Sequence, residues 1–300
     1  MRLRDIVALI ILGIVVAVGQ IMRAGPDAPA PPPQAPPGTE NPRRPAPKVD
    51  PGKLWAEETE SWLNEGPNER FRLAPDWTPP ERRSVVDVGH RKTSGTGTAF
   101  AVGDGKWLTA RHVTDGCDKI GLQVAPRKGI QVTGTVNHPN ADVTLLTTRN
   151  GPPPFPLGGD AAKGDDGYMV GFPKGRPGAV HATKIGTTVL QERGRYKTRE
   201  RADVWSERSR VPDRFDSLGG LSGGPAFAAD GRLVGVVLAE EPRRGRVISA
   251  EPATLRRMIE QAGTTGATEA AGPFDAETYP RTARGLLTSL RVAKVLCRVH

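Results

Sequence analysis

The sequence has few cysteines and few aromatic residues for its length. Only two of its 300 residues are cysteine, and Phe, Trp and Tyr together account for 5%. Two cysteines exclude a disulfide-dense scaffold and a cysteine-rich zinc module. The formal net charge of +9 raises the question of nucleic acid, but the basic residues are not interleaved with aromatics. We therefore expect no nucleic-acid partner.

Glycine and proline are abundant instead. The 36 glycines and 29 prolines are too many for a helical bundle. From Ser84 onward, short apolar runs alternate with Gly-rich turns, which predicts an all-β barrel or sandwich. An alternating apolar run near the C-terminus, at 293–299, predicts a final strand. The other expected strands are Val85–Val88, Gly97–Val102, Lys106–Ala110, Ile120–Val124, Gln131–Val136 and Val143–Thr147.

The longest uncharged run lies at the N-terminus. It covers the 17 residues from Ile6 to Met22, after Arg2 and Arg4. Residues 1–23 are therefore either a short transmembrane anchor or a signal peptide cleaved after the small residues of Ala17–Gly19. Both interpretations place the rest of the chain on the periplasmic or extracytoplasmic side, membrane-anchored if the segment is uncleaved and secreted if it is cleaved.

Two further segments precede the main domain. Residues 24–52 hold 11 of the prolines, which predicts a disordered, semi-rigid linker or, alternatively, a ligand for a proline-recognition domain. Residues 53–80 begin with an amphipathic pattern. Its large apolar residues predict packing on the main domain or, alternatively, a partner-binding face, and they are Leu54, Trp55, Trp62, Leu63 and Trp77.

Three short motifs carry the residue types of nucleophilic acyl transfer. His112 ends the run Thr-Ala-Arg-His, Asp142 opens Asp-Val-Thr-Leu-Leu, and Ser222 lies in Gly-Leu-Ser-Gly-Gly-Pro. This chemistry needs a hydroxyl, a base that accepts its proton, and an acid that orients the base. It also needs backbone N–H groups directed at the oxyanion, which Gly220 and Ser222 could supply.

Each of these residues also has a plain structural interpretation, as a surface histidine, a turn aspartate and a Gly-Ser-Gly turn. Asp142 opens an apolar run, where an unpaired buried carboxylate would be costly. The serine motif also spells the nucleophile elbow of α/β-hydrolases. That fold needs an acid and a histidine after the serine, and the only later histidine is His300.

In the order His112, Asp142, Ser222, the three motifs resemble trypsin-like (chymotrypsin-fold) serine proteases, closest to the bacterial HtrA-like branch but without a PDZ domain. The resemblance covers roughly residues 84–260. It implies two six-stranded antiparallel β-barrels with the active site in the cleft between them, in a domain spanning 81–262. Residues 263–300 would form a C-terminal extension. The implied function is a serine-type endopeptidase acting on proteins or peptides, with no metal and no organic cofactor.

The resemblance also implies a substrate pocket. Asp216, six residues before Ser222, stands where basic-specific members hold the acid that pairs with a substrate Arg or Lys. Leu238 and Glu240 replace the usual Ser and Gly of the pocket wall. The alternative is that Asp216 is a solvated loop acid. Leu221 replaces the aspartate of activatable members, so we expect activity without N-terminal cleavage.

Cys117 and Cys297 either form one disulfide in an exported protein or are small buried hydrophobes. The densely charged run 191–214 is either a solvated hairpin or a loop that regulates the site or steers substrate.

Two other functions stay open from the sequence alone. One is a catalytically silent protease-fold domain that serves as a binding or scaffold module at the membrane. The other is a basic envelope module that binds anionic polymers. The oligomeric state and the physiological substrate are not indicated by the sequence.

Overall fold

The computed structural model describes residues 54–63, 83–264 and 268–300. The hydrophobic run Ile6–Met22, the proline-rich linker 24–52 and Trp77 lie outside these ranges, so the predictions made for them stay predictions. Among the residues described, none of the helices combines the length and apolar character needed to span a bilayer.

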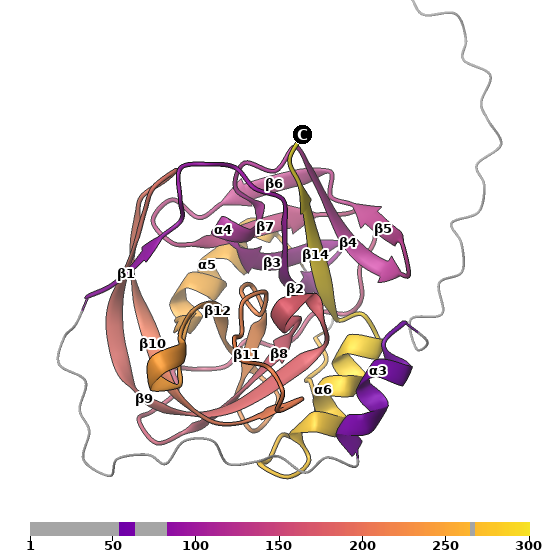
Figure 1. The fold of residues 1–300 in the computed structure, drawn as a ribbon, viewed down its shortest axis with the longest axis vertical. Coiled ribbons are helices and arrows are strands. Elements are labelled where there is room, and N and C mark those ends of the chain that lie inside the picture. Colours follow the sequence, from indigo (N-terminus) through magenta and orange to yellow (C-terminus); the bar gives the residue numbers. More distant parts are fainter. Residues whose placement is uncertain (1–53, 64–82, 265–267) are drawn as a thin grey trace, which may run out of the picture. The chain divides into compact units, whose positions relative to one another are not determined.

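The first sheet contains seven strands in the order β5-β4-β14-β2-β3-β7-β6, all paired antiparallel (Figure 1). β2 and β3 are joined by a two-residue turn in which Asp104 and Gly105 both have positive φ, as a type I′ hairpin requires. The strands are β2 (Gly95–Gly103), β3 (Lys106–Ala110), β4 (Lys119–Ala125), β5 (Lys128–Gln131), β6 (Gly134–Asn137), β7 (Val143–Thr147) and β14 (Val292–Arg298).

The single strand predicted over Gln131–Val136 is wrong, because the chain breaks there into β5 and β6. At the break the hydrogen-bond partner changes. The Val132 N–H donates to the carbonyl of Ile120, and the next residue, Thr133, donates to the carbonyl of Thr147. The chain thus passes from β4 to β7, and a straight strand cannot make that turn.

The second sheet has the order β1-β9-β10-β13-β12-β11-β8, and β9 also pairs with β8. Strands β8 to β13 therefore close into a six-stranded barrel, and β1 is added to β9 in parallel. The predicted two-barrel fold is confirmed, with a seventh strand in each sheet. The strands are β1 (Arg83–Asp87), β8 (Asp166–Gly171), β9 (Gly178–Arg193), β10 (Thr198–Val211), β11 (Pro225–Phe227), β12 (Leu233–Glu241) and β13 (Arg246–Ala250).

Two helices were not predicted, α5 (Pro252–Ala262) and α6 (Tyr279–Thr288). Both have a proline in the first turn, and α5 ends at Gly263 in the left-handed conformation. These are ordinary start and stop signals that the Gly-rich strand pattern obscured. The shorter helical segments are α3 (Ala56–Glu60), α4 (Arg111–Thr114) and the 3-10 turns η1 (Ser61–Leu63), η2 (Pro173–Gly175) and η3 (Pro242–Arg244).

The predicted amphipathic segment packs on the domain. Trp55 and Trp62 are buried, and the Trp55 ring lies 5.1 Å from the ring of Phe172. α3 lies beside α6 (Figure 1), and Arg284 of α6 donates to the side chain of Thr59 at 3.0 Å. Leu63, expected on the apolar face, is the last residue of η1 and is 45% exposed.

The predicted final strand is confirmed as β14, which lies inside the first sheet between β4 and β2. Cys297 of this strand forms a disulfide with Cys117, with a Cα–Cα distance of 5.4 Å. Cys117 follows α4 closely, so the disulfide ties the helix that carries His112 to the C-terminal strand.

Candidate active site

His112 is held at the point where β3 turns into α4. Ala110 ends β3 in an extended conformation, and α4 is a single turn that begins at Arg111. The Arg111 N–H donates to the carbonyl of Asp142 at 2.9 Å, which joins this turn to the start of β7. The side chain of His112 is 24% exposed, whereas that of Asp142 is 2% exposed. The histidine therefore reaches the surface of the site and the aspartate lies behind it.

The Asp142 carboxylate has three hydrogen-bond partners. Its Oδ2 lies 2.6 Å from Nδ1 of His112. Its Oδ1 accepts the backbone N–H of His112 at 2.9 Å and the hydroxyl of Tyr196 at 2.5 Å. These three hydrogen-bond partners compensate for the water that the buried carboxylate has lost. The structure thus brings two of the three predicted catalytic residues into direct contact.

This pairing sets the proton state of His112. Burial alone would lower the pKa of His112, but the charge of Asp142 and its hydrogen bond to the ring outweigh burial and raise that pKa. Because Nδ1 donates to Asp142, the neutral ring leaves Nε2 free to accept a proton. His112 therefore has the tautomer that a general base requires.

The Ser222 turn comes from the second barrel and docks on the first. The carbonyl of Ser222 accepts the N–H of Thr98 at 2.9 Å. Gly223 has φ of +83°, and a Cβ there would lie 2.2 Å from the carbonyl oxygen of Thr98 and 2.8 Å from the nitrogen of Ala110. Only glycine fits this contact. Ala110 is two residues before His112 in the chain, so the Ser222 turn docks on the end of β3 that leads into the histidine.

Gly220 needs to be glycine for a similar reason. Its φ is +101°, and a Cβ would lie 2.6 Å from the carbonyl oxygen of Phe172. The carbonyl of Gly220 accepts the Thr98 hydroxyl at 2.8 Å, which fixes the orientation of the Gly220–Leu221 peptide. Within the part of the chain that the structure describes, the N–H groups of Gly220 and Ser222 donate no hydrogen bond. Both donors are thus free for an external oxygen.

The residues predicted for a substrate pocket are more dispersed. Asp216 is 88% exposed, and its carboxylate lies 3.6 Å from Nζ of Lys174. Leu238 is buried in the core. Glu240 extends across to the segment before the nucleophile, where its carboxylate accepts the Ser217 hydroxyl and, at 2.7 Å, the Leu218 N–H. A role of these residues in substrate selection stays a prediction, and a basic substrate group at Asp216 would compete with Lys174.

The tip of the β9–β10 hairpin, residues 191–200, contributes groups to this site that the sequence reasoning missed. The interpretation of the charged run as a solvated hairpin is wrong, because alternate charged residues point inward. Glu192 is 1% exposed and Glu200 is 8% exposed. Glu200 accepts the N–H of Asp142 at 2.8 Å. Buried and exposed positions alternate at the start of β10, over residues 198–201, and the charged residues there form no apolar alternation that would have marked the buried ones in the sequence.

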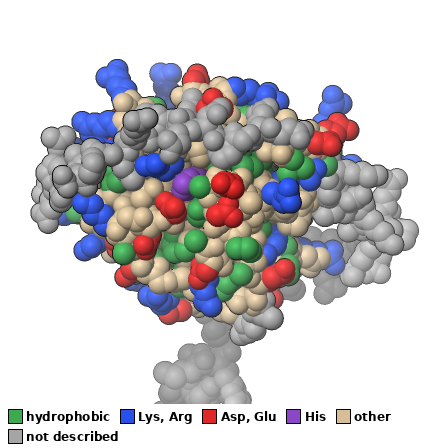
Figure 2. All heavy atoms as spheres, turned by 90° about the horizontal axis from the view of Figure 1, so that it is seen from below, with side chains coloured by type: hydrophobic (Ala, Val, Ile, Leu, Met, Phe, Trp, Pro, Cys, Tyr) green, Lys and Arg blue, Asp and Glu red, His purple; other side chains and the backbone are tan. Residues whose placement is uncertain are grey.

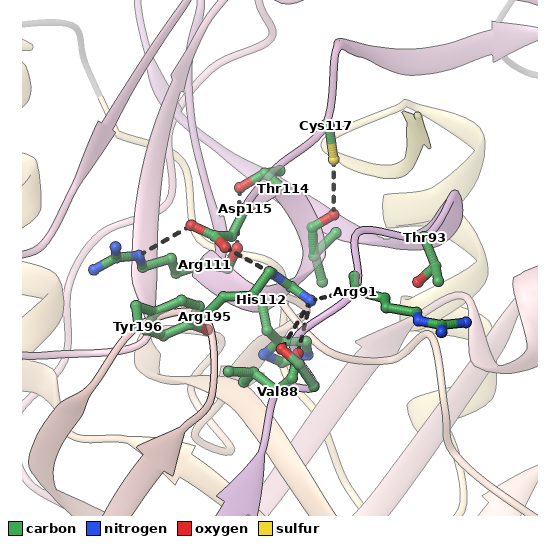
Figure 3. A network of polar contacts seen from close by, with 12 residues as sticks. Val88, Arg91, Thr93, Arg111, His112, Thr114, Asp115, Cys117, Arg195 and Tyr196 are labelled. Carbon is green, nitrogen blue, oxygen red and sulfur yellow. Dashed lines mark hydrogen bonds and ion pairs between the residues drawn. The ribbon is translucent and has the colours of Figure 1, made fainter. Parts of the chain in front are cut away.

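The hairpin tip is anchored by Arg195. Its guanidinium donates to Asp115 at 2.9 Å and to the carbonyls of Val88 and Arg91 at 2.7 and 2.9 Å. Figure 3 shows Arg195 and Tyr196 gathered beside Arg111 and Asp115. The tip is therefore attached both to α4 and to the segment after β1.

Glu192 is a buried carboxyl that accepts no hydrogen bond from another described residue. Burial and the nearby charge of Asp142 raise its pKa to about 7. Between the ordinary pKa of a glutamate and about 7, the unfolded chain releases this proton while the folded protein keeps it. The free energy of unfolding therefore falls as the pH rises through this window and changes no further above it.

We accordingly expect Glu192→Gln to stabilise the protein at pH 8 by about 3 kcal/mol, with the gain disappearing toward pH 4.5. Urea unfolding at several pH values measures this difference. Glu277→Gln, at an exposed glutamate, is the matched control and should show no such trend. A gain that did not depend on pH would contradict the assignment.

The distribution of surface charge and of metal-binding side chains bears on two of the predictions. Figure 2 shows Lys and Arg side chains interspersed with Asp and Glu on the face in view, so the basic excess forms no single-sign patch there. Across residues 54–63, 83–264 and 268–300, no group of three or more His, Cys, Asp or Glu is placed to hold a metal ion. The absence of a metal or cofactor stays a prediction.

Residues 97–236 match the family model described as a trypsin-like peptidase domain, and this span contains His112, Asp142 and Ser222. No curated protein matches the chain significantly.

Several solved structures are similar to part of this chain. The Rv3671c protease from M. tuberculosis in its active form has a TM-score of 0.48 at 21% identity, covering 59% of this chain and 77% of that one. The HtrA-type protease AlgW with a decapeptide has a TM-score of 0.41 at 20% identity, and the match covers 56% of this chain and 52% of that one. The MamO protease domain from Magnetospirillum magneticum has a TM-score of 0.41 at 18% identity, and the match covers 54% of this chain and 94% of that one. At these identities the likeness does not extend to activity or substrate.

Proposed function

Because this chain contains a trypsin-like peptidase domain, we propose that it is a serine-type endopeptidase whose catalytic residues are His112, Asp142 and Ser222. The observation that carries the proposal is the 2.6 Å contact between Nδ1 of His112 and the buried Asp142 carboxylate. This contact leaves Nε2 of the histidine as the acceptor. The other barrel contributes the Ser222 turn, whose carbonyl accepts the Thr98 N–H of the first barrel at 2.9 Å, which supports the proposal.

The reaction follows from this arrangement. The Ser222 hydroxyl attacks the scissile carbonyl while Nε2 of His112 accepts its proton, and Asp142 stabilises the imidazolium that forms. The oxyanion receives hydrogen bonds from the N–H groups of Gly220 and Ser222. His112 then gives its proton to the leaving amine as the C–N bond breaks. A water molecule, deprotonated by the same histidine, hydrolyses the acyl-enzyme and regenerates Ser222.

We further propose that the domain works outside the cytoplasm, attached through the N-terminal hydrophobic run or released from it. The Cys117–Cys297 disulfide supports this location, since structural disulfides persist mainly in oxidising compartments. Protein or peptide substrates fit the family. N-terminal sequencing of the mature protein would separate an uncleaved anchor from a cleaved signal.

The test of the enzymatic proposal is labelling of the full-length protein with a fluorophosphonate probe. Such a probe reacts with a serine only when a base has activated the hydroxyl. We expect the wild type to be labelled and Ser222→Ala to be unlabelled. Ser289→Ala, at an exposed serine near the end of α6, is the matched control and should label like the wild type.

The other outcomes are equally informative. Labelling that persists in Ser222→Ala would assign the nucleophile to another residue. A folded wild-type protein that is not labelled would favour the catalytically silent scaffold. Binding to an anionic polymer that weakens steeply with salt and is unchanged in Ser222→Ala would favour the basic envelope module.

A further inference from the structure

We propose that Tyr196, at the tip of the β9–β10 hairpin, is a positioning residue for the His112–Asp142 pair and acts through its hydroxyl on the Asp142 carboxylate. The proposal rests on the function proposed above, because it assigns a role in that same reaction. Tyr196 lies 54 residues from Asp142 in the chain and belongs to the second sheet's hairpin, whereas Asp142 precedes a strand of the first.

The tyrosine is fixed at both ends of its side chain. Its hydroxyl lies 2.5 Å from Oδ1 of Asp142, and the residue is 7% exposed. The guanidinium of Arg111 lies 4.0 Å from the centroid of its ring. Arg111 is the neighbour of His112 and itself donates its N–H to the Asp142 carbonyl. The Tyr196 side chain is thus held by Asp142 at its hydroxyl and by Arg111, the neighbour of His112, at its ring.

The backbone of the β9–β10 hairpin holds Tyr196 in this position. Gly194, two residues earlier, has φ of +124°, and a Cβ there would lie 3.1 Å from backbone atoms of Gly89. Arg195 then attaches the turn to Asp115 and to carbonyls after β1. A tyrosine carried by a turn with these anchors has little freedom to leave the carboxylate.

The two oxygens of the Asp142 carboxylate have different hydrogen-bond partners. Oδ1 accepts the Tyr196 hydroxyl and the His112 N–H, which leaves Oδ2 to face Nδ1 of the imidazole. Without the hydroxyl, one backbone donor alone would hold Oδ1, and the carboxylate could rotate about its terminal bond. The plane of the imidazole, and with it the direction of Nε2 toward Ser222, would then be less well defined.

The neighbouring charges give this donor a second effect. Glu192 and Arg195 act on the charge of His112 from the hairpin tip, and Glu192 and Glu200 lie near Asp142. Burial and the charge of Asp142 raise the pKa of the Tyr196 phenol, so its hydroxyl keeps its proton throughout the working range. Tyr196 is therefore a donor that pH does not switch off. Its loss would make the His112–Asp142 pair bind a proton more tightly.

The experiment compares Tyr196→Phe with the wild-type full-length protein on a peptide substrate. We expect kcat to fall about tenfold, as for the loss of one hydrogen bond to a charged group, with KM nearly unchanged. The acidic limb of the kcat/KM profile should move to higher pH, because the pair must lose its proton before it can act as a base. If Tyr196 served only in folding, Tyr196→Phe would not shift the acidic limb of the kcat/KM profile. It would also not lower kcat selectively while leaving KM unchanged.

The matched control is Tyr279→Phe. Tyr279 is also buried, and its hydroxyl lies 3.2 Å from that of Ser209, which is a partner outside the site. This variant removes the same atom from another buried position, so kcat and the pH profile should stay as in the wild type. Thermal unfolding of both variants shows that each is folded.

A second readout separates this proposal from the proposed function. The Nδ1–H proton of His112, hydrogen-bonded to Asp142, should give a far-downfield NMR resonance, assigned by its loss in His112→Ala. We expect Tyr196→Phe to broaden or shift this resonance and Tyr279→Phe to leave it unchanged. If the wild type hydrolyses nothing, the proposed function fails, and this resonance still decides the role of Tyr196. An unchanged resonance, or an unchanged pH limb in an active enzyme, would overturn the positioning role.

Discussion

Asp142→Asn is expected to lower kcat/KM about 10⁴-fold while leaving the protein folded. Oδ1 of Asp142 receives two donors, the Tyr196 hydroxyl and the His112 N–H. The amide oxygen of asparagine would take that position, and its NH₂ group would then face Nδ1 of His112. Two donors cannot bond to each other, so the ring would move its proton to Nε2. In that tautomer the histidine cannot accept the proton of Ser222.

The measurement is the rate with a peptide substrate, together with thermal unfolding to confirm the fold. Asp166→Asn is the matched control, because Asp166 also contacts a histidine, with 3.2 Å between its Oδ1 and Nε2 of His181, on another part of the domain. It should retain nearly full activity. An Asp142→Asn enzyme within tenfold of the wild-type rate would remove Asp142 from the mechanism.

Removal of the disulfide by the double substitution Cys117→Ala and Cys297→Ala is expected to lower the free energy of unfolding by about 5 kcal/mol in the chain-entropy treatment. The cysteines are 180 residues apart in sequence, so the cross-link restricts a large part of the unfolded chain. A loss of this size approaches the whole stability of many domains, which is about 5–15 kcal/mol. β14 would then be held in the first sheet by its strand pairing and burial alone.

Urea unfolding of the oxidised wild type and of the double variant measures this loss. Reduction of the wild type by a thiol should give a similar decrease, because it opens the same cross-link without changing a side chain. A double variant within about 1 kcal/mol of the wild type would mean that the unfolded chain is already compact enough to make the cross-link unimportant.

The features predicted correctly were those written in a few consecutive residues. Alternation of apolar residues located most strands, including β14 near the C-terminus. The two cysteines left a single pairing, and the structure contains it. The helices α5 and α6 also have an ordinary start signal, a proline in the first turn, but they lie in a Gly-rich sequence whose overall pattern predicts strands.

The offset of Asp216 from Ser222 does not determine where its side chain points. Its role in a substrate pocket stays a prediction, and in the structure its carboxylate is 88% exposed and lies 3.6 Å from Nζ of Lys174. Glu240, which follows the nucleophile by 18 positions, reaches back to the same loop instead. The direction of a loop side chain depends on what lies opposite, and spacing along the chain does not contain that information.

By itself, the sequence determined the strand pattern, the three motifs with their His, Asp and Ser, and the glycines that allow the serine turn its positive φ. Only the tertiary structure decided that Tyr196, Glu192 and Glu200 surround the His112–Asp142 pair. The physical reason is that these side chains belong to a hairpin of the second barrel. The reach of that hairpin across to the first barrel depends on strand length, bulges and the anchoring of Arg195. Contacts between elements that are distant in the chain arise from the packing of the two sheets, and no local pattern encodes them.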